Sequence, residues 1–528
     1  MTKSTRHGLA AALLALVAGT GRAEVALPAL LGEHMVAQRE VPLHLWGQAA
    51  PGERVTATFR GESRSAAADD LGRWSLSLAP SAAGGPFSLT VRASNTIRLD
   101  DVWVGDVWVA AGQSNMEFTL DAAEGAATEI PQANQPEIRF LRTTRRTSGF
   151  PLADVATEGW TVCTPQSAPK VSAVAYFFAR HVREHHPVPI GLVEASWGGT
   201  PLAAFTPLTT IASDAALLPT LLHWSRTADA RATTLLELEK ERRDLEAAGA
   251  RARAQGQPPP SAPWHPDFDA WAPAAIYNAM VAPLTPFAIR GVIWYQGESD
   301  ASPERAPVYA RLVQAMIRDW RRAWGVGDFP FLFVQLASWT AGPGNAWPEL
   351  REAQREALAL ANTGMAVAID VGHPTDIHPR DKKTVGTRLA LAARALAYGE
   401  RLEYSGPLFR QVTSEGEGLR VYFDHAEGLT TRGGAPVAGF EVAGGDGRYS
   451  PAEARIEGTT VVVSSAAVAA PRSVRYGWAD NPRVSLYNAA RLPASPFQAA
   501  PRPGRGARVS QLGSRAGRRC RAHSPCHV

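Results

Sequence analysis

Four short loops in this chain of 528 residues carry side chains that are capable of chemistry, and each loop follows a run of apolar residues. The loops read Gly112-Gln113-Ser114-Asn115, Ser196-Trp197-Gly198-Gly199, Gln296-Gly297-Glu298-Ser299 and Thr375-Asp376-Ile377-His378. One loop supplies a serine hydroxyl and another supplies an imidazole. A serine hydroxyl is a poor nucleophile at neutral pH until a neutral imidazole takes its proton. We therefore predict that Ser114 is a nucleophile and that His378 is its general base.

Attack of a serine on a carbonyl also requires hydrogen-bond donors for the oxyanion that forms. The backbone N–H of Ser114 is one candidate donor. Gly199 is a second, because a residue without a Cβ lets its N–H approach the reacting atoms closely. The side-chain amide of Gln296 is a third. This set of residues favours acyl transfer.

Each of these residues also has a purely structural interpretation. Ser114 can cap the helix after its strand, Gly199 can serve a tight turn, and His378 can cap the next helix. Gln296 can brace neighbouring loops by hydrogen bonds. The catalytic interpretation is favoured because the four loops follow separate strands of one predicted sheet.

A metal site is not indicated. His373, Asp376 and His378 lie close together in the sequence, but they lack a metal-ligand spacing such as H-E-x-x-H. The sequence also has no glycine-rich phosphate loop of either common type. We therefore expect neither a metal nor an organic cofactor.

The four loops are positioned by short, wholly apolar runs that alternate with helical stretches, which is typical of a parallel sheet covered on both faces. Helical spacing occurs at Val174, Phe178 and Val182. In open sheets of this kind, the loops at the carboxyl ends of the strands meet in one crevice. We predict a doubly wound α/β domain over residues 101–400, with strands in the runs 107–111, 190–195, 289–295, 331–336 and 365–370.

Alternation with a period of two residues predicts a β module on each side of this domain. Residues 24–100 predict a β-sandwich-like module, and residues 401–498 predict a second β module. A charged segment at about 208–272 interrupts the α/β domain, and a solvated helical excursion is favoured there over a lid. Residues 499–528 are rich in Pro, Arg, Gly and Ser without periodicity, which predicts disorder.

The N-terminus predicts export. Residues 1–23 combine basic residues, a short apolar run and Gly21-Arg22-Ala23, which is the order of a secretory signal peptide with cleavage after Ala23. The apolar run is too short to span a bilayer as a mature helix, and no later segment is long and apolar enough. We therefore expect a periplasmic or extracellular protein without a membrane span.

The formal net charge of +4 does not indicate nucleic-acid binding. Residues 1–23 hold three Lys/Arg and residues 499–528 hold seven arginines, and neither segment holds an acid. Because the basic residues of these two segments together exceed the net charge of +4, the part of the chain between them carries a small net negative charge. It has no basic stripe with interleaved aromatic residues. Cys163 stands alone, and Cys520 and Cys526 lie in the tail, so the cysteines form no disulfide framework.

The sequence resembles the sialate O-acetylesterase family within the SGNH hydrolase superfamily. The matching stretches are GDVWVAAGQSNME at 105–117, EASWGGTPL at 194–202, GVIWYQGESD at 291–300 and DIHPRDK at 376–382, with further likeness at 35–53 and 474–482. The resemblance covers residues 28–498. It implies an SGNH hydrolase domain between two β regions and a carbohydrate acetylesterase with Ser114 as nucleophile, Gly199 as oxyanion donor and His378 as base.

Two positions depart from the superfamily pattern. Its third block usually carries an asparagine as oxyanion donor, and the resemblance transfers that role to Gln296. The orienting acid usually precedes the histidine by three positions, but Thr375 stands there and Asp376 precedes His378 by two. Asp376 is therefore the first candidate for this acid, Glu298 is the rival, and a dyad oriented by a backbone carbonyl is the remaining alternative.

The resemblance implies an O-acetylated carbohydrate as the substrate and no cofactor. Because an acetyl group is small, specificity must come from the alcohol side, and Trp197, Trp294 and Glu298 are candidate sugar contacts. Two alternatives stay open: an acetylesterase of plant hemicellulose (xyloglucan or xylan), and a non-catalytic carbohydrate-binding protein on the same scaffold. The intact Ser114 and His378 count against the second. The sequence does not indicate an oligomeric state.

Overall fold

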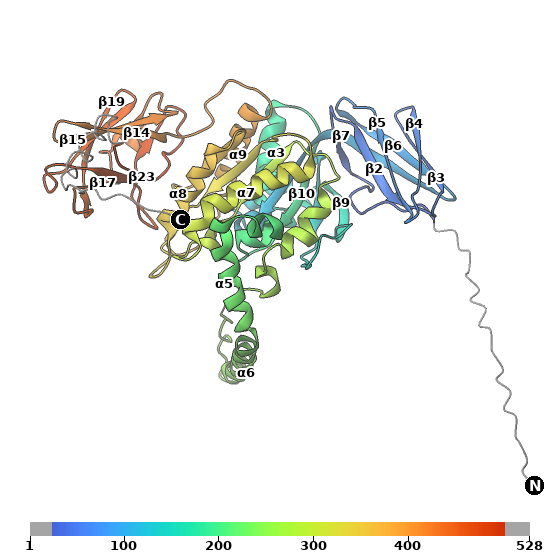
Figure 1. Cartoon of the computed structure of the whole chain (residues 1–528), viewed down its shortest axis with the longest axis horizontal. Coiled ribbons are helices and arrows are strands. Elements are labelled where there is room, and N and C mark those ends of the chain that lie inside the picture. The colour runs from blue at the N-terminus through green and yellow to red at the C-terminus, as the bar shows by residue number, and fades with distance from the viewer. Residues whose placement is uncertain (1–23, 264, 502–528) are drawn as a thin grey trace, which may run out of the picture.

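The computed structural model describes residues 24–263 and 265–501, and Figure 1 shows a central α/β body between two β regions. The N-terminal strands (blue) form one β region, and the C-terminal strands (orange to red) form the other. This mixed α/β architecture with a largely parallel central sheet is the coarse fold that the apolar runs predicted. The predicted signal peptide and residues 502–528 of the predicted tail lie outside the described residues.

The central sheet has the strand order β13-β12-β11-β7-β10-β8-β9. All neighbours along this path are parallel except β8 and β9. Its five predicted strands are present and almost wholly buried, whereas β8 and β9 were not predicted because polar and charged residues interrupt their apolar pattern. The strands are β7 (Thr96–Gly112), β8 (Gln135–Thr143), β9 (Thr157–Cys163), β10 (Ile190–Ser196), β11 (Gly291–Tyr295), β12 (Phe331–Gln335) and β13 (Thr363–Val367).

Strand β7 lies at the point where the order of strands in the sheet reverses. Its two neighbours in the central sheet are β10 and β11. After β7 the chain builds β8, β9 and β10 on one side, and it then builds β11, β12 and β13 on the other. Open α/β sheets bind their ligands at such a switch point, outside the carboxyl ends of the strands. The fold therefore places the loop after β7 in the predicted crevice.

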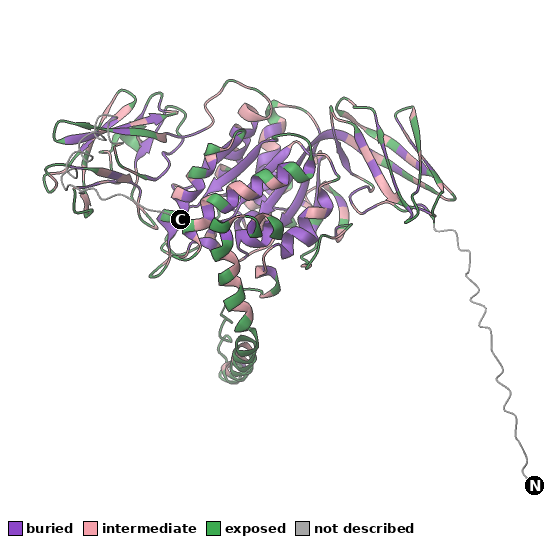
Figure 2. Ribbon diagram, in the orientation of Figure 1, coloured by how far each residue is buried: buried purple, intermediate pink, exposed green. Residues whose placement is uncertain are grey.

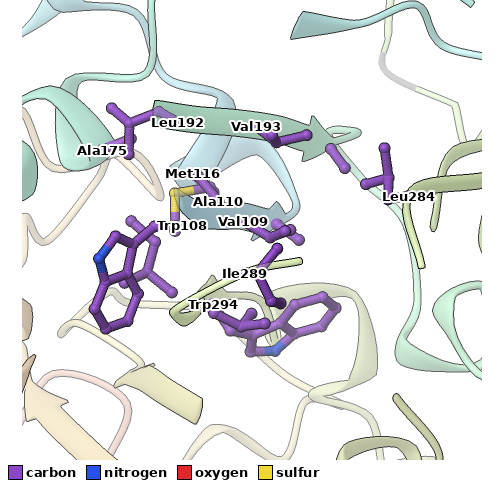
Figure 3. Close-up of a cluster of buried hydrophobic side chains, with 14 of the residues drawn as sticks. Trp108, Val109, Ala110, Met116, Ala175, Leu192, Val193, Leu284, Ile289 and Trp294 are labelled. Carbon is purple, nitrogen blue, oxygen red and sulfur yellow. The ribbon is translucent and has the colours of Figure 1, made fainter. Parts of the chain in front are cut away.

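Helices cover both faces of the sheet. Side chains alternate between faces along a strand, and Gly291 of β11 pairs with Trp108 of β7, so Trp108 and Trp294 point to opposite faces. Figure 3 shows Trp108 grouped with Met116, and Trp294 on the other side with Ile289. The Trp108 face is covered by α3 and α9, and the Trp294 face by α7, which packs against α8. These helices are α3 (Ala173–His185), α7 (Ala306–Trp324), α8 (Trp347–Glu356) and α9 (Lys382–Leu396).

The expected boundary between residues 100 and 101 falls inside β7. The first half of this strand pairs with β6 and β1, and its second half pairs with β10 and β11. Burial along β7 changes from alternating to continuous at Val104, which explains why the sequence pattern changes although the strand does not end. The N-terminal strands are β1 (Val36–Gln38), β2 (Leu43–Gln48), β3 (Arg54–Phe59), β4 (Glu62–Ala67), β5 (Arg73–Leu78) and β6 (Gly84–Arg92).

A helical arm interrupts the α/β body between β10 and β11. It contains α4 (Leu208–Ala212), α5 (Leu218–Asp229) and α6 (Arg231–Ala254). Figure 1 shows α5 and α6 projecting away from the sheet, and Figure 2 shows α6 as largely exposed. Gly249 is the only buried residue in α6. The segment is therefore helical and α6 is exposed, whereas the choice of a solvated excursion over a lid stays a prediction.

The C-terminal region consists of antiparallel sheets around their own apolar core. One sheet has the order β14-β15-β20-β19, another has the order β18-β17-β21-β23, and β16 pairs with β22. The strands are β14 (Leu408–Glu415), β15 (Gly418–Asp424), β16 (Thr430–Thr431), β17 (Phe440–Ala443), β18 (Tyr449–Pro451), β19 (Glu453–Glu457), β20 (Thr460–Ser464), β21 (Ser473–Tyr476), β22 (Leu486–Tyr487) and β23 (Phe497–Ala499).

Arg351 of α8 joins this region to the α/β body. Its guanidinium is fully buried and donates to the carbonyls of Leu336 and Ala337 on one side and of Ala479 and Asp480 on the other. Burial lowers the pKa of Arg351 to about 9.

Among the described residues, no helix has the length and apolar character that crossing a membrane requires.

Candidate active site

Ser114 and His378 meet at the carboxyl edge of the central sheet. Ser114 is the first residue of α1 (Ser114–Glu117), which directly follows β7, and His378 lies in the loop between β13 and α9. Nε2 of His378 lies 2.8 Å from Oγ of Ser114. This distance allows the imidazole to take the hydroxyl proton. The structure thus brings together the two residues that the sequence analysis paired.

The turn that presents Ser114 depends on Gly112. This residue has φ +135°, and a Cβ built on it would lie 2.1 Å from the carbonyl oxygen of Tyr295. The next residue, Gln113, donates its backbone N–H to the same carbonyl at 2.9 Å. Any larger side chain at position 112 would push β7 away from β11. The close contact between β7 and β11 therefore fixes the position of Ser114 at the start of α1.

The loop around His378 is shaped by Asp376. The backbone N–H of His378 donates to Oδ1 of Asp376 at 2.8 Å, whereas Nδ1 of His378 lies 3.9 Å from that oxygen. The second distance is too long for a hydrogen bond. Burial lowers the pKa of His378, the positive charge of Lys382 lowers it further, and Asp376 acts in the opposite direction. The imidazole is therefore held in its neutral, basic form down to a lower pH than usual.

Asn115 links the His378 loop to Glu298. Its Nδ2 donates to Oε1 of Glu298 at 2.5 Å and to the backbone carbonyl of Ile377 at 3.0 Å. Its Oδ1 accepts a hydrogen bond from Nζ of Lys382. The other carboxylate oxygen of Glu298 is buried and has no hydrogen-bond partner among the described residues. Glu298 therefore makes no direct hydrogen bond to His378. Because one of its oxygens is bound to Asn115 and the other is buried, the carboxylate does not offer the sugar contact that was predicted.

Lys382 is fully buried beneath this network. It is the first residue of α9, where the positive end of the helix dipole disfavours a cation. Burial lowers its pKa to about 7, and Nζ lies 4.7 Å from the centre of the Phe118 ring and 5.4 Å from that of Tyr295. Burying an ammonium group in this position destabilises the fold, so we infer that Lys382 serves the site. The only signals of Asn115 and Lys382 in the sequence were their places beside Ser114 and after His378.

Two backbone N–H groups are available for an oxyanion. Those of Ser114 and Gly199 donate to no acceptor in the described part of the chain. Gly199 has φ +74°, a conformation that favours glycine. Gly198 packs against Ser114, because a Cβ on Gly198 would lie 3.1 Å from the Ser114 Cβ. The glycine loop therefore lies directly beside the hydroxyl.

The prediction that Gln296 donates to the oxyanion is wrong. Its side chain is fully buried, and its Nε2 donates to the carbonyl of Thr200 at 3.2 Å and to Oδ2 of Asp300 at 2.6 Å. Its Oε1 accepts from the hydroxyl of Tyr309 at 3.0 Å. Both N–H bonds of the amide are thus engaged. Gln296 braces the loops, which was the structural interpretation that the sequence left open.

The prediction that Trp294 contacts a sugar is also wrong. Trp294 is 1% exposed, and it packs against Phe205, Trp320 and Phe331 in the core. Trp197 is different, because it is only partly buried and follows β10 at the carboxyl edge. The Arg145 guanidinium lies 5.8 Å from the centre of its ring. Trp197 remains the aromatic candidate for a sugar contact.

A cavity of about 430 Å³ lies beside the glycine loop, over the carboxyl ends of β8 and β10. It contains three cationic side chains, and each has an acidic partner. Arg145 donates to Glu117, which also accepts the backbone N–H of Gly198 at 2.9 Å. The other two pairs are Arg142 with Glu194 and Lys170 with Asp121. The cavity is therefore polar and close to charge balance.

His373 and Asp376 do not form a metal cluster with His378. The backbone N–H groups of Thr375 and Asp376 donate to Nδ1 of His373, so this residue shapes the loop. The described residues place a different group, His181, Glu184 and His185, together on α3. The absence of a metal beside Ser114 stays a prediction.

Comparison with known proteins identifies similar sequences. A family profile described as "carbohydrate esterase, sialic acid-specific acetylesterase" matches residues 104–217 and 262–395. The unmatched residues between these segments include α5 and α6. The mouse sialate O-acetylesterase is 29% identical over 525 residues, which cover 88% of this chain and 93% of the mouse protein. The human sialate O-acetylesterase is 31% identical over 418 residues, which cover 72% of each.

A solved structure resembles most of the chain. It is a carbohydrate acetylesterase from Xanthomonas citri, with 38% sequence identity and a TM-score of 0.78. The match covers 90% of this chain and 99% of that protein. The likeness therefore includes the α/β body and the β regions on both sides.

Proposed function

Because the chain belongs to the sialic acid-specific acetylesterase family of carbohydrate esterases, we propose that it removes O-acetyl groups from carbohydrates through Ser114. It is a carboxylic ester hydrolase, and its relatives support carbohydrate acetylesterase activity. The interpretation as a non-catalytic binding protein is therefore abandoned. The observation that carries the serine mechanism is the 2.8 Å contact between Ser114 Oγ and His378 Nε2.

The proposed reaction begins when Oγ of Ser114 attacks the acetyl carbonyl carbon and His378 takes the hydroxyl proton. The tetrahedral intermediate places its negative oxygen between the N–H groups of Ser114 and Gly199. Collapse of the intermediate breaks the bond to the sugar oxygen, which receives the proton from His378. An acetyl group then remains on Ser114. Water activated by His378 attacks it, releases acetate and restores the serine.

We assign the orientation of His378 to two devices. Asp376 holds the backbone N–H of His378, and its carboxylate favours the imidazolium that forms during the reaction. Asn115 holds the neighbouring carbonyl of Ile377 and is anchored by Glu298 and Lys382. A reaction of this kind uses only protein atoms, so it requires no cofactor. The contact between Ser114 and His378 supports the assignment of the α/β body to the SGNH hydrolases, and the proposed oxyanion hole uses Ser114 and Gly199 without Gln296.

We propose that the sugar binds over Trp197, beside the cavity that contains Arg145. The names of the mouse and human relatives favour an O-acetylated sialic acid. The cavity could bind a neutral sugar as well as a sialic acid, because each of the cations described there is already paired with an acid and none of them is left free for a sialate carboxylate. Acetylated xylan or xyloglucan fragments are therefore the second candidate substrates.

We also propose that the enzyme acts outside the cytoplasm. This rests on residues 1–23, whose order of basic, apolar and small residues is that of a secretory signal peptide. N-terminal sequencing of protein recovered from the periplasm or medium tests it, and we expect Glu24 as the first residue.

The substrate is tested by acetate release from O-acetylated sialic acids, xylo-oligosaccharides and xyloglucan fragments. Ser114→Ala serves as the control, since it removes the nucleophile and adds no bulk. We expect release from one class, and we expect it to disappear in Ser114→Ala. Release that persists in a pure, folded Ser114→Ala protein would overturn the serine mechanism.

A further inference from the structure

Hydrogen bonds hold the glycine loop beside Ser114 at Gly198, Gly199, Thr200 and Leu202, and among the described residues they leave free the Gly199 N–H that is proposed for the oxyanion. Glu117 accepts the N–H of Gly198 at 2.9 Å. Gln296 donates to the carbonyl of Thr200, and Asp300 accepts the N–H of Leu202 at 2.8 Å. The remaining contact belongs to the carbonyl of Gly199 itself. That carbonyl belongs to the residue whose N–H is the proposed oxyanion donor.

Trp271 supplies this contact. Its indole Nε1 donates to the carbonyl oxygen of Gly199 at 2.7 Å. Trp271 stands in a 3-10 turn, Asp269–Trp271, where the chain returns from the helical arm to the α/β body. Three residues later the backbone N–H of Ala274 donates to the carbonyl of Ala203 at 2.9 Å. The returning segment thus runs along the glycine loop.

A cationic side chain also packs over the Trp271 ring. The guanidinium of Arg305 lies 5.2 Å from its centre. Arg305 donates to the carbonyl of Ser299 at 2.9 Å, and it lies 3.1 Å from Nε2 of His223 in α5. Arm and body therefore both hold the ring. An indole has few rotamers, so a ring held in this way aims its N–H at one point.

We propose that Trp271 is a positioning residue that orients the Gly199 N–H toward the oxyanion, an inference that rests on the proposed serine mechanism. With φ at +74°, Gly199 lies in a conformation from which a glycine can rotate easily. The Gly199 N–H belongs to the planar peptide unit between Gly198 and Gly199, so it turns only if the peptide units on either side allow that unit to rotate. The bond from Trp271 to the Gly199 carbonyl fixes the peptide unit that follows, and the bond from the Gly198 N–H to Glu117 fixes the one that precedes. The donor between them therefore keeps its direction. Preorganised donors are effective because they need no reorientation as charge develops.

The test is Trp271→Phe, which removes the N–H and keeps an aromatic ring. We expect kcat for p-nitrophenyl acetate to fall about tenfold, with KM changed less than about twofold, because the donor acts mainly on the transition state. Trp224→Phe is the matched control. It makes the same substitution at a half-buried tryptophan of α5 whose ring contacts Phe268. It should leave both constants unchanged.

A double variant separates positioning from a general structural effect. If Trp271 acts through Gly199, then Trp271→Phe should cost little in a Gly199→Ala background, where the donor is already displaced. Fully additive losses would overturn the proposal, and so would an unchanged kcat in Trp271→Phe. Wild-type protein that does not turn over the ester would contradict the proposed function, and the role of Trp271 would fall with it.

Discussion

The side chain of Asn115 donates to the Glu298 carboxylate at 2.5 Å, although 183 positions separate the two residues. This bond matters because Asn115 follows the proposed nucleophile directly and also holds the loop of His378. The carboxylate thus reaches the site through a neutral amide instead of touching the imidazole. A second carboxylate, Asp376, holds the backbone of His378 from the solvent side. The two acids can be separated by experiment.

Asp376 should matter more as a hydrogen-bond acceptor than as a charge. Asp376→Asn keeps an oxygen for the His378 N–H, so we expect kcat to fall only about threefold. Asp376→Ala removes the acceptor and should cost about tenfold or more. Steady-state kinetics of both variants test this. A loss of several thousandfold in Asp376→Asn would instead identify Asp376 as an acid bonded to Nδ1 during the reaction.

Glu298 should stabilise the fold together with Lys382. Glu298→Gln removes a negative charge that favours the buried Lys382 ammonium and leaves an unpaired amide, so we expect the free energy of unfolding to fall by about 2 kcal/mol. Glu304→Gln, at an exposed carboxylate of the same loop, should have little effect. In denaturant titrations, Glu298→Gln should cost less in a Lys382→Met background than alone. Equal costs would mean that the two charges are not coupled.

The acid limb of the pH profile should depend on Lys382. His378 must be neutral to accept a proton, so kcat/KM falls as the pH drops through its pKa. Lys382 is charged below about pH 7 and lowers that pKa. Lys382→Met should therefore move the acid limb to higher pH, by about 0.5 units. The neighbouring exposed Lys383→Met should leave the limb in place, and a limb that also stays in place in Lys382→Met would contradict this coupling.

Arg351 should hold the C-terminal β region to the α/β body. Arg351→Met leaves four carbonyls without their buried donor, so we expect a loss of stability on the order of 3 kcal/mol. The C-terminal region should then become sensitive to limited proteolysis. Arg322→Met is the control, because Arg322 is exposed and pairs with Asp319 on its own helix, α7. Identical digestion patterns for all three proteins would contradict this role.

The meeting of Ser114 and His378 could be predicted from the sequence because both follow buried apolar runs. Such runs form parallel strands, and the carboxyl ends of parallel strands share one edge. The inner strands were predictable for the same reason. Strands β8 and β9 were not, because Arg139 and Arg142 interrupt the apolar pattern of β8. The boundary expected at residue 100 lies within β7, because the change of burial along this strand alters the sequence pattern although the strand continues.

The support around the site could not be predicted in the same way. The contact between Lys382 and Asn115 joins residues 267 positions apart, and it depends on how α9 meets the loop after β7. Composition and periodicity carry no information about such a pairing. Gln296 illustrates the opposite error. Its position after β11 indicated a role in the site, whereas the direction of its amide, set by Thr200 and Asp300, excludes an oxyanion bond.

The most direct test of the serine mechanism is to locate the acetyl-enzyme. The protein is mixed with p-nitrophenyl acetate, quenched in acid within the first turnover and digested for mass spectrometry. We expect one acetyl group on the peptide that contains Ser114, formed at the rate of the initial burst. It should be absent in Ser114→Ala. Rapid turnover without acetylation of Ser114, or with the acetyl group on another residue, would contradict the assignment of Ser114 as the nucleophile.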